Sequence, residues 1–92
     1  MKVVINSCYG GFGLSDQAMQ ILKDRKGNTI DLFYFNDNRD DSDLIEVVER
    51  LGYTANDDFS KLKVVEIPDG VNYTIEEYDG LEHIAEIHRT WY

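Results

Sequence analysis

The sequence predicts a single α/β domain of the mixed α+β kind over residues 1–92, with one mixed sheet, two helices and a carboxyl-terminal hairpin. Three observations predict this class. Short runs of β-branched and aromatic residues alternate with two stretches of helical apolar spacing. A glycine follows each of those stretches, where helices commonly end. Asp79-Gly80 has the chemistry of a two-residue hairpin turn.

The first half of the chain predicts a strand, a helix and a second strand. Residues 2–7 contain the apolar triplet Val3-Val4-Ile5, which is typical of a buried strand. Ser15 can cap a helix over residues 15–26, because apolar side chains recur there at helical spacing. Residues 30–35 are rich in strand formers and are predicted to form the second strand.

The second half predicts a helix and then three strands. An apolar stripe indicates a helix over residues 42–51, capped by Ser42 or Asp41. The three strands are residues 62–67, 73–78 and 81–88. The last segment also has helical spacing, so its alternative is a terminal helix; the hairpin turn before it favours the strand.

Three of these strands are expected to run parallel if they are neighbours, because crossover connections are right-handed. They are residues 2–7, 30–35 and 62–67. Ligands gather beyond the carboxyl ends of parallel strands in open sheets. A glycine-rich segment follows the first of these strands and is expected to lie at that edge.

This glycine-rich segment is the best candidate for a binding site. Its glycines allow backbone N–H groups to approach a ligand at a helix start, which suits an anion. Its aromatic residues can stack on a base. The segment lacks the lysine of a P-loop and the spacing of a dinucleotide fingerprint. We predict a nucleotide or another phosphate-bearing ligand, the alternative being a tight turn that needs glycine for its geometry. The candidate ligand-binding residues here are Asn6, Cys8, Tyr9, Gly10, Gly11, Phe12 and Ser15.

The carboxyl-terminal segment supplies the rest of the predicted site, namely Glu82, His88, Arg89 and Trp91. Arg89 can hold a phosphate by two hydrogen bonds, and Trp91 can stack on a base. The alternative for Trp91 is a place at the edge of the core. The carboxylates and histidines here do not have metal-ligand spacing, so neither a metal nor another cofactor is predicted.

Cys8 opens a second, enzymatic interpretation. It lies between a strand and a helix start, where a thiolate can act as a nucleophile. His88 or His83 would then be the base, with Glu82 or Glu86 to orient it. A single cysteine is more often a small buried apolar residue. The sequence therefore favours binding over catalysis, and the one cysteine is compatible with a reducing compartment.

The net charge of −9 limits the classes of partner. Fifteen of the 18 carboxylates follow residue 35, and this charge repels nucleic acid phosphates, so direct nucleic acid binding is not expected. A basic protein partner is compatible with it. The acidic run invites a third interpretation, in which carboxylates imitate DNA phosphates and inhibit a host protein; the alternative is an acidic surface that maintains solubility. The run comprises Asp37, Asp40, Asp41, Asp43, Glu46 and Glu49, with Asp57 and Asp58.

No apolar run reaches the length of a membrane span, and the amino terminus has no signal-sequence pattern. We therefore expect no membrane association and a cytoplasmic location. The sequence leaves the oligomeric state open.

The chain resembles a family of small bacteriophage and prophage proteins. The resemblance lies in VINSCYGGFGLS at residues 4–15, in EYDGLE at residues 77–82 and in EIHRTW at residues 86–91, and it extends to residues 47–52 and 64–68. It implies a phage-linked accessory protein in the cytoplasm of a bacterial host, acting on host or phage factors. It carries over no activity and no catalytic residue.

Overall fold

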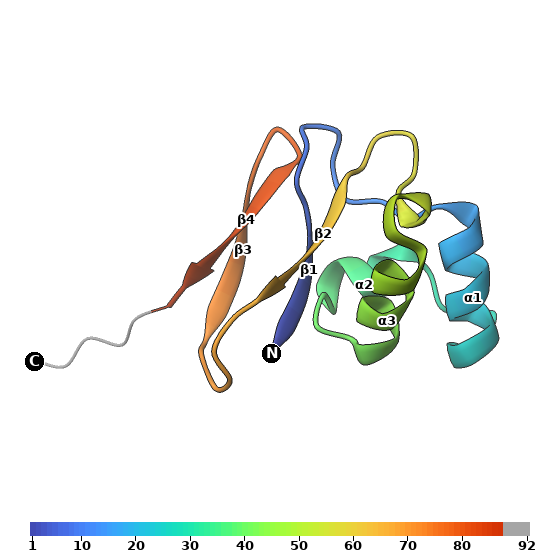
Figure 1. The fold of residues 1–92 in the computed structure, drawn as a ribbon, viewed down its shortest axis with the longest axis horizontal. Coiled ribbons are helices and arrows are strands. Elements are labelled where there is room, and N and C mark those ends of the chain that lie inside the picture. Colours follow the sequence, from blue (N-terminus) through green and yellow to red (C-terminus); the bar gives the residue numbers. More distant parts are fainter. Residues whose placement is uncertain (88–92) are drawn as a thin grey trace, which may run out of the picture.

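A computed structural model describes residues 1–87 as a mixed α+β fold. Its elements are β1 (Lys2–Asn6), α1 (Asp16–Lys26), α2 (Leu32–Asp37), α3 (Ser42–Leu51), the 3₁₀ helix η1 (Gly52–Ala55), β2 (Leu62–Glu66), β3 (Tyr73–Tyr78) and β4 (Leu81–Glu86). The β1–β2 ribbon lies between the helices and the β3–β4 hairpin (Figure 1). None of these helices has the length and apolar content needed to cross a membrane.

β1 is buried on both faces because it lies between these two layers. Successive side chains of a strand point to opposite faces. Val4 therefore packs among the helices, in a cluster that includes Leu22 and Phe35. Val3 and Ile5 pack instead in a second cluster on the hairpin side. Burial on both faces explains why this strand is apolar at consecutive positions rather than at alternate ones.

The predicted helix starts are confirmed by their capping hydrogen bonds. Ser15 caps α1, because its Oγ accepts a hydrogen bond from the Ala18 N–H at 3.1 Å. Asp41 rather than Ser42 caps α3, and its carboxylate accepts hydrogen bonds from the first free N–H groups of that helix. Both helices end within a residue of the predicted position.

The predicted hairpin is also confirmed. Tyr78 and Leu81 face each other across the turn, and the two residues between them have φ angles of 50° and 91°. Positive φ at both central positions defines the turn type that Asp-Gly favours. The strand predicted for residues 81–88 is present as Leu81–Glu86, so the alternative of a terminal helix is wrong.

The strand predicted for residues 30–35 is wrong, because this segment forms α2. Asp31 caps the helix by accepting a hydrogen bond from the Tyr34 N–H at 3.1 Å. One face of the helix buries Phe35 completely, whereas Phe33 is 78% exposed. A short apolar run fits a strand and a helix equally well, and here the local cap and the burial of one face decide for the helix.

The predicted mixed sheet of five strands, three of them parallel if neighbouring, is also wrong. β1 pairs with β2 in the antiparallel sense, with Val4 opposite Val64, and β3 pairs only with β4 among the described residues. Since α2 replaces the expected second strand, no neighbouring strand is left to receive a right-handed crossover from β1. A ligand site was expected beyond the carboxyl ends of parallel strands, and among the described residues no strands pair in parallel.

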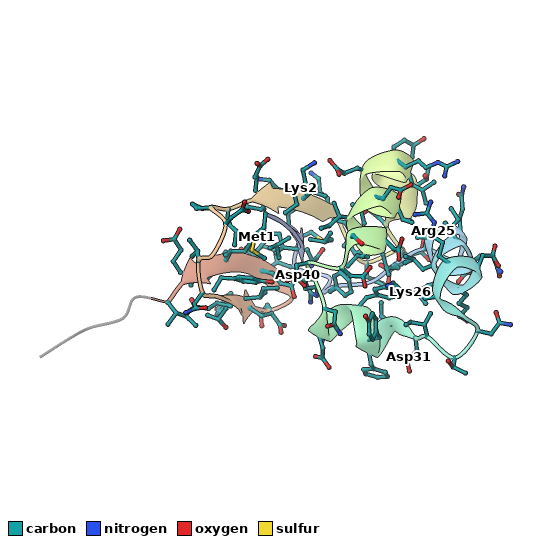
Figure 2. All side chains as sticks on the ribbon, turned by 90° about the horizontal axis from the view of Figure 1, so that it is seen from below. Met1, Lys2, Arg25, Lys26, Asp31 and Asp40 are labelled. Carbon is teal, nitrogen blue, oxygen red and sulfur yellow. The ribbon has the colours of Figure 1, made fainter. Side chains whose placement is uncertain are left out.

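Basic residues at the end of α1 face the acidic start of α3 (Figure 2). Lys26 Nζ lies 2.8 Å from Asp41 Oδ2, and Arg25 Nη1 lies 2.8 Å from Glu46 Oε2. Burial raises the pKa of Asp41. The hydrogen bonds from Lys26 and from the N–H groups of α3 lower this pKa by more than burial raises it, so the net shift is downward. These ion pairs join the two longest helices.

We expect Asp41 to contribute to acid unfolding. Its pKa is lower in the folded protein, so its stabilising effect is complete above the unfolded pKa and is lost as the pH falls through the folded one. Asp41→Asn keeps a capping group but removes the charge. It should cost about 1 kcal/mol near neutral pH and make the loss of stability at acid pH smaller, as measured by urea unfolding across the pH range.

Asp24→Asn is the matched control, since Asp24 is exposed and accepts a hydrogen bond from Gln20. If the free energy of unfolding of Asp41→Asn falls as steeply at acid pH as that of the wild type, Asp41 does not contribute to acid unfolding.

Candidate functional site

A buried ion pair joins the loop between α2 and α3 to the β3–β4 hairpin. Arg39 Nη1 and Nη2 lie 2.7 Å from Glu82 Oε1 and Oε2, and both side chains are less than one-tenth exposed. The remaining guanidinium N–H groups donate to Val4 O, Asn36 O and Asn36 Oδ1. All five donors of the guanidinium are therefore used, which is the condition for burying this charge without a large penalty.

This pair also closes the free edge of β1. Alternate residues of an edge strand direct their backbone groups away from the neighbouring strand. On this edge, the Val4 N–H donates to Arg39 O at 2.9 Å, and the Asn6 N–H donates to Glu82 Oε1 at 2.7 Å. Arg39 and Glu82 thus occupy the positions where a third strand would bond, which explains why β1 and the hairpin form separate sheets.

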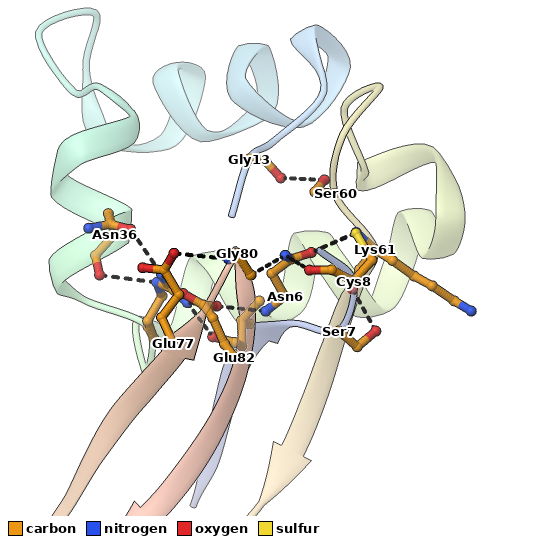
Figure 3. Close-up of polar contacts among 12 residues, drawn as sticks. Asn6, Ser7, Cys8, Gly13, Asn36, Ser60, Lys61, Glu77, Gly80 and Glu82 are labelled. Atoms are coloured by element: carbon orange, nitrogen blue, oxygen red, sulfur yellow. Dashed lines mark hydrogen bonds and ion pairs between the residues drawn. The ribbon is translucent and has the colours of Figure 1, made fainter. Parts of the chain in front are cut away.

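Asn6 connects three loops at one end of the molecule (Figure 3). Its side chain is fully buried, and its Nδ2 donates to Cys8 O at 2.6 Å and to Gly80 O at 2.7 Å. Its Oδ1 accepts from the Lys61 N–H at 2.8 Å. We call this end, formed by residues 7–15, 56–61 and 78–81, the loop end; its three loops lie together in Figure 1.

The glycines of the loop end allow its segments to pack closely. A Cβ atom on Gly10 would lie 1.7 Å from Phe59 O, and one on Gly13 would lie 1.9 Å from Asp57 Oδ2. A Cβ atom on Gly80 would lie 2.5 Å from both Gly11 N and Tyr9 O. These contacts support the interpretation of the segment as a tight turn that needs glycine for its geometry, because only residues without a Cβ atom let the neighbouring loops approach this closely.

The predicted ligand residues of the glycine-rich segment have different surroundings. Phe12 is covered by Arg39, whose guanidinium carbon lies 3.7 Å from the ring centroid. Ser15 is occupied as the cap of α1, and its N–H donates to Ala55 O at 2.8 Å. Tyr9, in contrast, is 66% exposed.

Of the predicted carboxyl-terminal residues, only Glu82 lies within the described residues. His88, Arg89 and Trp91 lie outside them. Glu82 does meet the glycine-rich segment, through its bond to Asn6, but as a buried structural group.

A groove beside the start of α1 is lined by Leu14, Ser15, Asp16, Asn56, Asp57 and Asp58. Three of these six residues are acidic. Carboxylates repel phosphate groups, so this groove does not favour the phosphate-bearing ligand predicted from the helix start.

Cys8 is held as a hydrogen-bond donor. Its Sγ lies 3.2 Å from Phe59 O and 3.4 Å from Asn6 Oδ1. His83 contacts Glu76 at 3.0 Å on the exposed face of β4, opposite to the face on which Glu82 is buried. The site therefore has a structural thiol, and no triad forms from Cys8, His83 and Glu82. Residues 1–87 contain no cluster of three or more potential metal ligands.

Half of the acidic run proposed as a DNA mimic is paired inside the molecule, and this half lies at α3. Asp41 and Asp43 contact Lys26, Glu46 contacts Arg25, and Glu49 contacts Lys2. Among the acidic residues on α2, α3 and the loop between them, only Asp37 and Asp40 form no ion pair within residues 1–87. This pairing reduces the charge that α3 can present to a basic groove.

Sequence reasoning missed Arg39, Asn36 and Phe59. Arg39 is the one cation between Asn36 and Asp43. A single arginine within an acidic run is a sequence signal for an ion pair. Phe59 contacts Gly10 and Cys8 through its backbone carbonyl, and side-chain type does not predict that contact.

No family model matches the chain, and no curated protein or solved structure matches it. The resemblance to bacteriophage and prophage proteins therefore stays a prediction, and the functional argument depends on the geometry.

We expect Gly80→Ala to separate the hairpin turn from the glycine-rich loop. Gly80 and Gly70 both have positive φ, but a Cβ atom on Gly70 would meet nothing within 4 Å. Gly70→Ala should therefore cost about 1 kcal/mol from the backbone conformation alone. Gly80→Ala should cost a further ~1–3 kcal/mol because the new methyl group meets backbone atoms. Urea unfolding of the two variants measures the difference, and equal losses would contradict the close contact.

Proposed function

We propose that this protein acts by binding a protein partner through its loop end, without catalysing a reaction. The observation that carries the proposal is the exposure of three aromatic side chains there. Tyr9 is 66% exposed, and Phe59 and Tyr78 are each 71% exposed. Aromatic residues are enriched in protein interfaces, because each buries a large area with few rotatable bonds.

The loop end also has the rigidity that favours binding. Asn6 links all three loops by hydrogen bonds, and the glycine contacts bring their backbones together. A surface held in place before binding loses less conformational entropy when the partner arrives. The three aromatic residues are presented from segments fixed in this way.

A nucleotide or phosphate-bearing ligand is the second candidate. The exposed ring of Tyr9 supports it, since a base can stack there. The carboxylates of the groove beside α1 oppose it. For this reason the protein partner is the better-supported proposal, and the resemblance to phage proteins suggests a host or phage protein in the bacterial cytoplasm.

Site-specific photocrosslinking in bacterial cells tests the proposed surface. A photoreactive phenylalanine analogue at position 9 or 78 should form a covalent adduct with a partner protein, visible as a band of higher mass. Position 33 is the matched control, because Phe33 is an equally exposed aromatic residue on α2, away from the loop end. Adducts at position 33 alone, or at none of the three positions, would contradict the proposal.

A further inference from the structure

We infer that the loop end binds a cationic segment of its protein partner, one rich in arginine or lysine. This inference rests on the proposed function and names the chemistry of the partner. The aromatic residues supply the apolar area that a partner would bury, and the charge around them determines which kind of partner binds.

Carboxylates stand next in sequence to two of the three exposed aromatic residues of the loop end. Asp58 precedes Phe59, and Asp79 follows Tyr78. Both aspartates are exposed. Asp16 and Asp57 line the adjoining groove with Asp58. An incoming polypeptide that covers the aromatic rings would therefore meet several negative charges.

These carboxylates differ from those of the helix layer in their pairing. On α3, Asp43, Glu46 and Glu49 are matched by basic side chains of α1 and β1. Within residues 1–87, no ion pair involves Asp16, Asp57, Asp58 or Asp79. The molecule thus pairs the carboxylates of α3, whereas the loop end has three unpaired carboxylates, Asp57, Asp58 and Asp79, against one cation, Lys61. This excess of negative charge is complementary to a cationic partner.

The interior already contains the contact that such a partner would make. Arg39 stacks on Phe12 with 3.7 Å between its guanidinium carbon and the ring centroid, while its two terminal nitrogens bond Glu82 at 2.7 Å. Arginine satisfies an aromatic face and a carboxylate together because its guanidinium is planar and carries a fork of donors. An arginine of the partner would find the same two groups at Phe59 and Asp58.

Titration with an oligoarginine peptide, followed by amide NMR shifts of the full chain, tests the inference. Shifts should concentrate at residues 7–15, 56–61 and 78–81 and should weaken as salt is added. Asp58→Asn/Asp79→Asn should raise the dissociation constant about fivefold, since each exposed charge contributes modestly. Asn at position 79 keeps the turn, because Asn-Gly favours the same geometry.

Two controls separate the surface from bulk charge. Asp24→Asn/Asp37→Asn removes the same number of charges from α1 and α2 and should leave the affinity unchanged. Phe59→Ala should weaken binding, whereas Phe33→Ala should not. Equal weakening by both charge variants would overturn the inference, and so would shifts at the loop end with ATP but none with oligoarginine.

Failure of the cationic-partner inference can be distinguished from failure of the proposed protein-binding function. Partner adducts at positions 9 and 78, together with no oligoarginine binding, would overturn the cationic partner and leave the binding surface in place. Oligoarginine shifts confined to the loop end support both.

Discussion

The buried Arg39–Glu82 pair is the interaction on which the arrangement of this fold depends. It joins three parts of the molecule: the loop between α2 and α3, the free edge of β1 and the hairpin. A charge in the interior is tolerated only when its hydrogen bonds are complete, and here all five guanidinium donors have acceptors. This requirement fixes the distance and orientation of the hairpin relative to β1 more narrowly than apolar contacts alone could.

The position of the hairpin in turn determines the shape of the loop end. Because Glu82 holds β4 beside β1, the turn at Gly80 reaches Asn6 and the backbone of Tyr9. The glycine-rich segment is therefore enclosed by its neighbours on the inside and presents the ring of Tyr9 on the outside. The polar groups of this segment are used for assembly, and the exposed rings of the loop end are the basis of the proposed binding surface.

Local signals in the sequence predict the starts of α1 and α3 and the hairpin turn, although the cap at Asp31 was missed. Ser15, Asp41 and Asp79-Gly80 act through neighbours a few residues away, so their effects follow from the sequence. The strand direction and the site geometry depend on contacts between distant residues, such as Glu82 with Arg39, and nothing local marks those partners. The sequence predicts Glu82 as a ligand-binding residue, whereas the fold buries it in an ion pair, and the fold decides which of the nine lysines and arginines it meets.

The free energy of unfolding of Glu82→Gln, compared with that of Glu46→Gln, tests the role of the buried pair most directly. Gln at position 82 leaves Arg39 charged and buried without its counter-ion, so a loss of about 3 kcal/mol or more is expected. Glu46 pairs with Arg25 at the surface, and its loss should cost less than about 1 kcal/mol. Equally small losses for the two variants would contradict the account.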